Sequence, residues 1–131
     1  MNIELIEIPK IENVLGTIGV VENNTIPFEM KRVYYLYDIP SSASRGGHAH
    51  KNLRQVLIAI SGSFDVIVKD GFSEEKITLN KPNMGLLINA NIWRELDNFS
   101  SGAVCLVMAS AVFDESDYIR DYQTFLEYLQ G

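Results

Sequence analysis

The chain has little cysteine and no long hydrophobic run. Cys105 is the single cysteine among 131 residues, which excludes an intrachain disulfide and any cysteine-rich zinc site. The longest apolar runs, such as 103–109, fall far short of the roughly 20 residues that span a bilayer. The first residues also lack the basic segment that begins a signal peptide. We therefore expect a cytoplasmic protein that does not enter a membrane.

Positive charge is also scarce, since 11 Lys and Arg residues face 17 Asp and Glu residues, for a net charge of -6. This balance argues against a broad phosphate-binding surface for nucleic acid, while a few local arginines can still hold a small anion. The length and the 47% hydrophobic content predict one globular domain over 1–131, because no linker, repeat or low-complexity tract interrupts the chain.

Most of the chain consists of short β-branched and apolar runs separated by turn residues. Ser61-Gly62-Ser63 separates two such runs as a hairpin, and Asp70-Gly71 marks a further turn. Strands are expected at 3–8, 14–22, 28–39, 56–60, 64–68, 76–79, 86–88 and 103–109, with a loop at 40–47. After Ser116, a candidate N-cap, the apolar spacing becomes helical. The helical spacing runs through Ile119, Tyr122, Phe125, Leu126 and Leu129. The pattern predicts an all-β fold, a Greek-key or jelly-roll sandwich or barrel, with a C-terminal helix.

Both histidines lie in one short segment, Arg45-Gly46-Gly47-His48-Ala49-His50-Lys51. In an extended strand, residues two apart point to the same side, so the two imidazoles would share one face. The clustering of all the histidine beside a glycine pair and an arginine favours a functional site over two unrelated solvated or core side chains. Imidazoles with an ordinary pKa of ~6.5 are suited to proton transfer.

The spacing His-x-His, then Gln55 and Gly62, follows the first motif of the cupin superfamily, in which glutamate normally stands at the position of Gln55. The second cupin motif resembles the stretch 82–85, but the chain has no third histidine. A transition-metal site usually takes three or four nitrogen, sulfur or carboxylate ligands. Two histidines with an amide in the carboxylate position make a poor site. The sequence therefore resembles a metal-free cupin, and we expect no metal and no other cofactor.

More of the chain resembles one cupin group, the nucleotide-sugar 3,4-ketoisomerases of the WxcM-like family. The most specific matches are the block 45–51 and the block Asp117-Tyr118-Ile119-Arg120. Further matches are Pro27-Phe28, 31–35, 55–57, Pro82, Gly85-Leu86, Trp93, Phe99-Ser100 and Asp114-Glu115. One departure is Arg94, which follows Trp93 where some relatives have histidine, and it leaves the role of this position open.

The resemblance implies a cupin-type jelly roll, a homodimer often with exchanged strands, and dTDP-4-keto-6-deoxy-D-glucose as the substrate. It also implies the reaction, in which the ketone moves from C4 to C3. The product would then pass to an aminotransferase and an acyltransferase. These steps make 3-acylamino-3,6-dideoxyhexoses for surface polysaccharide, such as the O-antigen of lipopolysaccharide, or for S-layer glycan.

The chemistry needs a base for the C3 proton, which the neighbouring ketone makes acidic, and a second group for reprotonation at C4. By resemblance to the related 3,5-epimerases, His48 is expected as the C3 base, and His50 would handle the proton at C4 or on its hydroxyl. A cationic or phenolic donor, Arg45 or a tyrosine, would stabilise the enediolate oxygen. The resemblance favours Tyr35, with Tyr37 as the weaker candidate. Strand alternation places Arg32 and Tyr34 on the opposite face.

The diphosphate needs fixed donors, and the planar guanidinium fork of arginine suits it. Arg45 is the first choice, followed by Arg32, Lys51 and Arg54, although the last two fit a solvated surface equally well. Trp93 is a candidate to flank the site or the nucleotide. The block Asp114–Arg120 is interpreted as structural, ordering the helix or a dimer contact.

Three other interpretations stay open at this point. A 3,5-epimerase is a neighbouring enzyme class, although such chains are usually longer and lack His-Ala-His. A sugar-nucleotide-binding cupin without catalysis would use the histidines as polar contacts, and measurement of turnover separates it from an enzyme. A two-histidine metal cupin, such as a dioxygenase, is separated by metal analysis. The sequence leaves the galacto or gluco configuration at C4 undecided.

We predict that the expected isomerase activity survives chelation, because Gln55 replaces the usual carboxylate ligand and the third histidine is missing. The measurement is turnover after dialysis against EDTA, with metal content determined on the same sample. Stoichiometric iron, zinc or nickel whose removal abolishes turnover would contradict the prediction.

Overall fold

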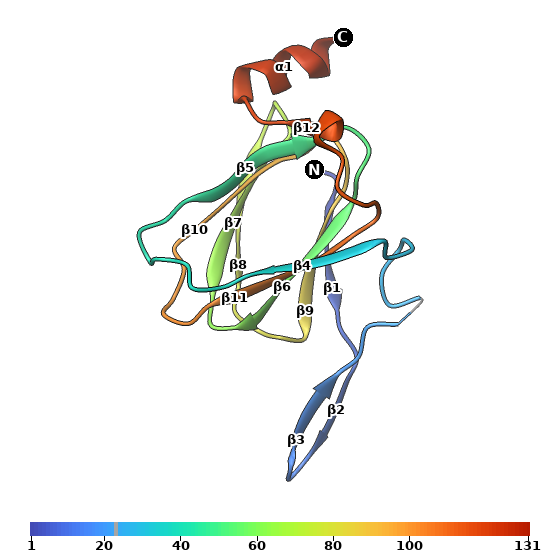
Figure 1. Cartoon of the computed structure of the whole chain (residues 1–131), viewed down its shortest axis with the longest axis vertical. Coiled ribbons are helices and arrows are strands. Elements are labelled where there is room, and N and C mark those ends of the chain that lie inside the picture. Colours follow the sequence, from blue (N-terminus) through green and yellow to red (C-terminus); the bar gives the residue numbers. More distant parts are fainter. Residues whose placement is uncertain (23) are drawn as a thin grey trace.

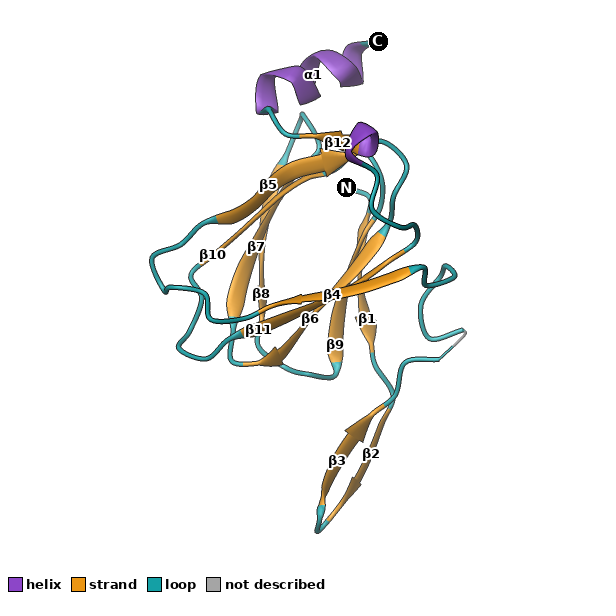
Figure 2. Ribbon diagram, viewed as in Figure 1, coloured by secondary structure: helices purple, strands orange, loops and turns teal. Residues whose placement is uncertain are grey.

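The computed structural model describes residues 1–22 and 24–131, and its body is built around two five-stranded antiparallel sheets (Figures 1 and 2). The first sheet has the order β1 (Ile3–Glu7), β9 (Met84–Ile88), β6 (Gln55–Ser61), β11 (Val104–Ala109), β4 (Arg32–Leu36). The second has the order β12 (Tyr118–Ile119), β5 (Arg45–His50), β10 (Trp93–Asp97), β7 (Phe64–Lys69), β8 (Glu74–Leu79). Strands far apart in sequence are thus neighbours, as in a jelly roll, and the predicted all-β fold with a C-terminal helix is confirmed.

Strand alternation divides the apolar residues between the space inside the two sheets and the outer face of the first sheet. In β6, Leu57 and Ala59 join the inner cluster, whereas Val56 and Ile58 join the outer one. The inner cluster includes Phe64, Val66, Leu79, Leu86, Leu96, Cys105 and Val107. The outer cluster adds Ile8, Ile26, Leu87 and Met108. The chain before β4 therefore covers the outer face of the first sheet. The core of the molecule lies between the inner faces of the two sheets.

The C-terminal helix α1 (Tyr122–Gln130) packs on the second sheet at one end of the molecule (Figure 1). Its N-cap is Asp121, whose carboxylate accepts a hydrogen bond from the backbone N–H of Thr124 at 3.0 Å. The prediction of Ser116 as the cap is wrong, because Ser116 lies in a short 3₁₀ turn, η1 (Glu115–Asp117). Ile119 is also outside the helix, since β12 is held extended by pairing with β5. Among the described residues, no helix is long and apolar enough to cross a membrane.

A hairpin of β2 (Lys10–Asn13) and β3 (Gly16–Gly19) stands apart from both sheets and projects from the body (Figure 1). The expected strand 14–22 is therefore only partly correct, since Val14 and Leu15 form the turn of this hairpin. The apolar side chains of Ile11, Val14, Leu15 and Ile18 are exposed. No cluster of the described residues packs around them, so their exposure needs another explanation.

Other elements also differ from the sequence expectation: β10 was not expected at all, and β8 and β9 each begin two residues before the expected 76–79 and 86–88. β5 begins at Arg45, inside the expected loop 40–47, because its pairing with β10 extends that far. β4 covers only 32–36 of the expected run 28–39. The hairpin turn at 61–63 is confirmed: Gly62 has a φ of +68°, and a Cβ there would lie 2.9 Å from the Cα of Ala103. Only glycine satisfies both conditions at this turn.

Candidate active site

A cavity of about 310 Å³ opens on the inner side of β4, β5, β10 and β12. It is lined by Arg32, Tyr34, Leu36, Arg45, Gly46, His48, Arg94, Leu96, Tyr118 and Arg120. Four of the five arginines of the chain thus face one cavity, and the described residues that line it include no acid. On a chain with a net charge of -6, this is a local positive site that favours an anionic ligand.

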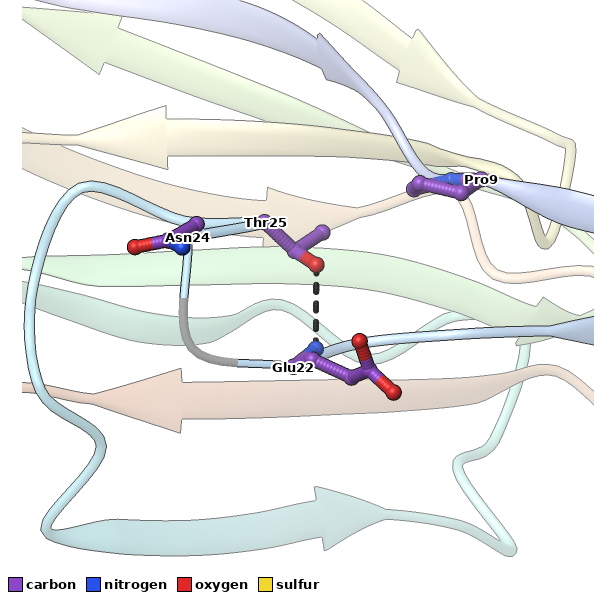
Figure 3. Close-up of a pocket in the computed structure, with 4 residues that line it drawn as sticks. All are labelled: Pro9, Glu22, Asn24 and Thr25. Carbon is purple, nitrogen blue, oxygen red and sulfur yellow. Dashed lines mark hydrogen bonds between the residues drawn. The ribbon is translucent and has the colours of Figure 1, made fainter.

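A larger hollow of about 620 Å³ lies at the base of the projecting hairpin, lined by Pro9, Glu22, Asn24 and Thr25 (Figure 3). Its one drawn hydrogen bond runs from the backbone N–H of Glu22 to the hydroxyl of Thr25, at 2.9 Å. These four residues supply one carboxylate and no imidazole or guanidinium. The smaller cavity is therefore the candidate for chemistry, despite its size.

The two histidines point inward from β5, as the alternation of the strand predicts. Ala49, between them, points outward into a buried cluster with Trp93, Ile119 and Phe125. Both imidazoles are almost fully buried, and their ring centroids lie 4.9 Å apart in an edge-on arrangement. The outward packing of Ala49 thus fixes the orientation of the strand, and with it the inward direction of both imidazoles.

Arg94 lies directly across from His48 in the register of β10 and β5. Its guanidinium donates hydrogen bonds from Nη2 to His48 Nε2 at 3.1 Å and to the Tyr34 hydroxyl at 3.4 Å. Because a guanidinium only donates, His48 Nε2 is the nitrogen without a hydrogen. Arg94 is 3% exposed, and its Nε and Nη1 have no hydrogen-bond partner among the described residues. The cavity wall therefore holds a buried positive charge with unused donors.

Both histidines are held in the neutral form. Burial and the positive charge of Arg94 lower the pKa of His48 to about 2. The same two causes lower the pKa of His50 to about 4, although its hydrogen bond with Asp117 acts in the opposite direction. A neutral imidazole is the form that accepts a proton, so at pH 7 both side chains are ready to act as bases.

His50 itself is absent from the cavity lining, but its ring contacts two residues that are present in it. Its centroid is 4.3 Å from that of Tyr118 and 4.9 Å from that of His48. Tyr118 is opposite His50 in the pairing of β12 with β5. On the far side of the ring, Nδ1 of His50 is 3.1 Å from a carboxylate oxygen of Asp117.

Three guanidinium groups surround the cavity away from the histidines. Arg32 donates to the Tyr118 hydroxyl at 3.3 Å, and its guanidinium lies 4.8 Å from the centre of the Tyr34 ring. Arg120 stacks on Tyr118 at 4.2 Å and forms two hydrogen bonds with the Glu115 carboxylate, at 2.8 and 2.9 Å. Arg45 is exposed and adjoins Gly46 in the same wall. Aromatic stacking thus orients two of the three cations.

Four of the expected site residues, His48, Arg45, Arg32 and the neighbouring His50, come together at this cavity. Tyr35 and Tyr37 do not, and their expected place in the site needs correction. Tyr35 lies on the outer face of β4 and Tyr37 follows the end of this strand, and they are 60% and 61% exposed. The alternation of the strand turns Tyr34, together with Arg32, toward the cavity instead.

Trp93, Lys51 and Arg54 also lie elsewhere. Trp93 is buried against α1 on the outer face of the second sheet, with its ring 5.3 Å from that of Tyr122. Lys51 lines a second hollow, which shares Tyr118 and Arg120 with the cavity. The guanidinium of Arg54 stacks on Phe28 at 5.3 Å. The position of each side chain in its strand or turn directs it away from the cavity.

The sequence analysis missed Tyr34, Arg94, Asp117, Tyr118 and Arg120 as site residues. The sequence contained a signal for two of these residues, Tyr34 and Arg94. Tyr34 shares a strand face with Arg32, which was already a candidate. Arg94 is a charged residue two positions before the buried Leu96, on the same strand face. The last three residues belong to the block 114–120, and only the pairing of β12 with β5 brings them here.

The buried side chains of Gln55 and Cys105 are relevant to two other kinds of chemistry, metal binding and nucleophilic attack by a thiolate. The side-chain amide of Gln55 is buried, and neither its nitrogen nor its oxygen has a partner within the described residues. Within the same part of the chain, no three His, Cys, Asp or Glu side chains are grouped as metal ligands would be. Burial raises the pKa of the Cys105 thiol to about 12, so this thiol does not form a nucleophilic thiolate at neutral pH.

Comparison with known proteins gives consistent matches over the full chain. Residues 1–130 match the model of a family described as FdtA: WxcM-like, C-terminal. A TDP-4-oxo-6-deoxy-α-D-glucose-3,4-oxoisomerase of Aneurinibacillus thermoaerophilus is 43% identical over 98% of this chain and 94% of that protein. The crystal structure of a 3,4-ketoisomerase from Helicobacter canadensis is 44% identical, with a TM-score of 0.98 over 100% of this chain and 99% of that one.

A third relative was solved with a ligand. It is a histidine-to-asparagine mutant of the 3,4-ketoisomerase QdtA from Thermoanaerobacterium thermosaccharolyticum, in complex with TDP-4-keto-6-deoxyglucose. It is 40% identical, with a TM-score of 0.95 over 97% of this chain and 93% of that one.

Because His48 is buried in its neutral form, we predict that the free energy of unfolding decreases at acidic pH. In the unfolded chain a histidine binds a proton near pH 6.5, whereas folded His48 has a pKa of about 2. Its contribution to the free energy of unfolding is therefore complete above pH 6.5 and decreases as the pH falls below it, by about 1.4 kcal/mol per pH unit.

Urea unfolding of the wild type and of His48→Gln between pH 7 and pH 4.5 measures this effect, because the variant keeps a polar side chain without a titrating group. The wild type should lose stability more steeply below pH 6.5, by about 1.4 kcal/mol per pH unit. Parallel curves for the two proteins would show that folded His48 titrates normally.

Proposed function

The chain belongs to the FdtA (WxcM-like, C-terminal) family, and we propose that it is a sugar-nucleotide 3,4-ketoisomerase acting on dTDP-4-keto-6-deoxy-D-glucose. The product is a dTDP-3-keto-6-deoxyhexose. The observation that carries the proposal is the cavity itself, in which a neutral histidine and a buried, partly unpaired guanidinium lie 3.1 Å apart. The relatives named as oxoisomerase and ketoisomerase, one of them bound to this sugar nucleotide, support the same substrate.

The first half of the reaction needs a base at the C3 hydrogen and a positive group at the C4 oxygen. His48 Nε2 is the nitrogen without a hydrogen, and in the free protein its electron pair accepts a hydrogen bond from Arg94. For the first task the guanidinium turns this hydrogen bond to the C4 oxygen of the substrate, which leaves the electron pair of Nε2 for the C3 hydrogen. Removal of the proton moves negative charge onto the C4 oxygen, and the unused donors of Arg94 are available to it. A donor already fixed in a buried site stabilises such an oxyanion by a few kcal/mol. The base and the oxyanion donor are thus neighbours, as the adjacent carbons C3 and C4 require.

The second half returns a proton to C4 and moves the hydroxyl hydrogen from the C3 oxygen to the C4 oxygen. We assign one of these transfers to His50, whose ring contacts His48 and Tyr118 at the cavity. The Tyr34 hydroxyl, 3.4 Å from Arg94, is a second group that can hydrogen-bond to a sugar oxygen. No step requires an electron acceptor, because oxidation at C3 is balanced by reduction at C4.

The nucleotide end of the substrate carries a diphosphate, and we propose that Arg45, Arg32 and Arg120 hold it. All three line the cavity. Their positive charge is local, so it can bind an anion although the protein as a whole is acidic. Lys51 and Arg54, which lie elsewhere, have no part in this binding.

We also propose that the protein is a homodimer in which the hairpin β2–β3 covers a second copy. A hairpin of two strands is marginally stable by itself in water, and this one exposes Val14 and Leu15 almost completely. β4 is an edge strand of the first sheet, and Tyr35 in this strand and Tyr37 just after it are exposed. An apolar hairpin and an aromatic edge strand on the same chain are complementary surfaces. This assigns the two tyrosines to an interface.

A cytoplasmic location suits the proposed enzyme, because its single cysteine is buried as a free thiol and needs no oxidising compartment. A 3-keto sugar nucleotide is a substrate for reductive amination at C3. We therefore propose that an aminotransferase and then an acyltransferase follow, as in the synthesis of 3-acylamino-3,6-dideoxyhexoses for surface polysaccharide or S-layer glycan.

The histidine roles predict different results for two variants in D2O. His48→Asn should lose roughly 10²–10⁴-fold in turnover and also lose hydrogen exchange at C3, because the base for the first proton is missing. His50→Asn should make product slowly but keep part of the C3 exchange, which needs only the first half of the reaction. NMR of the recovered sugar nucleotide measures both quantities.

Arg45→Ala is the matched control for binding. Calorimetry with TDP should show more than tenfold weaker binding in this variant, since a charge-assisted contact is worth more than ~1.4 kcal/mol, and near wild-type affinity in His48→Asn. Exchange at C3 that is lost in His50→Asn but kept in His48→Asn reverses the assignment. Near wild-type turnover in both histidine variants rejects the mechanism.

The dimer proposal predicts a species of twice 14.7 kDa in light scattering. The double variant Val14→Asp/Leu15→Asp should be monomeric, because charges on the hairpin oppose its burial. Phe72→Asp is the control: Phe72 is 97% exposed but lies in the turn between β7 and β8, so this variant should stay dimeric. A wild type of 14.7 kDa, or a dimeric hairpin variant, contradicts the proposal.

A further inference from the structure

The carboxylate of Asp117 is fixed beneath His50 by bonds that do not involve the imidazole. Its Oδ1 accepts from the backbone N–H of Asn52 at 2.9 Å, and its Oδ2 accepts from that of Leu53 at 3.2 Å. Its own backbone carbonyl accepts from the N–H of Lys51 at 2.9 Å. The side chain is 12% exposed. The turn after β5 and the end of η1 therefore hold both oxygens in place before the contact with His50 is considered.

This placement decides which nitrogen of His50 has the hydrogen. An ionised carboxylate only accepts hydrogen bonds, so Nδ1 of His50, 3.1 Å from Oδ2, must donate. In a neutral imidazole the other nitrogen, Nε2, then has the free electron pair. His50 Nε2 is buried and has no partner among the described residues, and its ring adjoins His48 and Tyr118. The one basic nitrogen of His50 is thus unused by the protein.

We propose that Asp117 is a positioning residue of the isomerase: it fixes His50 in the Nδ1–H form, so that Nε2 accepts the proton of the second transfer. This inference rests on the proposed function and adds a third residue of the block 114–120 to the site, after Tyr118 and Arg120, which line the cavity. Asp117 does not line the cavity, so it acts through His50 and not on the substrate. The lowered pKa of His50 agrees with this arrangement, because it keeps the imidazole neutral.

An amide at position 117 cannot reproduce this arrangement. Both backbone N–H groups, of Asn52 and Leu53, need an oxygen acceptor, and asparagine has only one. If that oxygen stays on Asn52, the amide NH2 faces His50 Nδ1 and donates to it. The hydrogen of the neutral imidazole then moves to Nε2, which is the nitrogen that must be free. If the oxygen instead stays on Leu53 and His50, the Asn52 N–H loses its acceptor and Nδ1–H faces a neutral oxygen in place of a charged one. In either orientation, Asp117→Asn weakens the preference for the Nδ1–H form with little change in size.

The direct test is a spectrum of the wild type. Long-range ¹H–¹⁵N correlation spectra of the imidazole rings report which nitrogen has the hydrogen, and the chain has only two histidines, so His48→Asn assigns them. In the free wild type at pH 7, His50 should show its hydrogen on Nδ1. A hydrogen on Nε2 overturns the proposal, whatever the activity of the protein. In Asp117→Asn the signal should shift toward the Nε2–H form.

Kinetics with dTDP-4-keto-6-deoxy-D-glucose complete the test. Asp117→Asn should lower kcat by roughly 10- to 100-fold and leave KM near the wild-type value, since Asp117 makes no contact in the cavity. The control is Asp114→Asn, which makes the same acid-to-amide change at the cap of the same turn, where Asp114 accepts from Ser116 N–H at 3.0 Å and does not contact His50. This control should keep the wild-type kcat and tautomer.

The outcomes separate this proposal from the proposed function. A wild type without turnover rejects the isomerase, and the tautomer spectrum then decides the role of Asp117 alone. An active wild type with an unchanged kcat in Asp117→Asn rejects the positioning role. So does a lower kcat with the wild-type tautomer, because the loss would then be structural.

Discussion

The hydrogen bond from Arg94 to His48 is the contact on which the site depends. A charge buried without a partner is destabilising by several kcal/mol, and no described residue that lines the cavity beside Arg94 supplies a carboxylate to offset this cost. Its partners are a neutral imidazole and a tyrosine hydroxyl. The guanidinium keeps His48 neutral, and the histidine leaves most of the positive charge uncompensated. The cavity therefore holds an unprotonated imidazole beside a positive charge before any substrate enters.

The packing on the opposite side of the same strands makes this arrangement rigid. Ala49, Trp93 and Ile119 belong to β5, β10 and β12, and all three pack against Phe125 of the terminal helix. Their neighbours in sequence, His48, Arg94 and Tyr118, point the other way into the cavity. The helix thus stabilises the three strands from outside. Because successive residues of a strand point to opposite faces, the same packing fixes the direction of the polar residues inside. A helix that touches no substrate is in this way part of what fixes the active geometry.

Local patterns predicted the parts of the molecule that depend on local geometry. The turn at Gly62 follows from its positive φ, and the common face of the two histidines follows from the period of a strand. Tyr35 was expected in place of Tyr34 because alternation separates the two faces of a strand without stating which one is inside. Asp121 and not Ser116 caps the helix because the intervening residues pair with β5. Arg94 and Asp117 reach the histidines through pairings across 46 and 67 positions of the sequence, which no local pattern contains.

The central claim is that this cavity moves a ketone between adjacent carbons, and the position of the carbonyl carbon tests it most directly. The wild type is incubated with dTDP-4-keto-6-deoxy-D-glucose labelled with ¹³C at C3 and C4, and the sugar is followed by ¹³C NMR in D2O. The account predicts that the carbonyl signal of C4 decreases while one appears at C3, with deuterium at C4 of the product. A carbonyl that stays at C4 while C3 and C5 exchange their hydrogens would indicate an epimerase. An unchanged spectrum with bound nucleotide would indicate a binding protein, and either result would contradict the account.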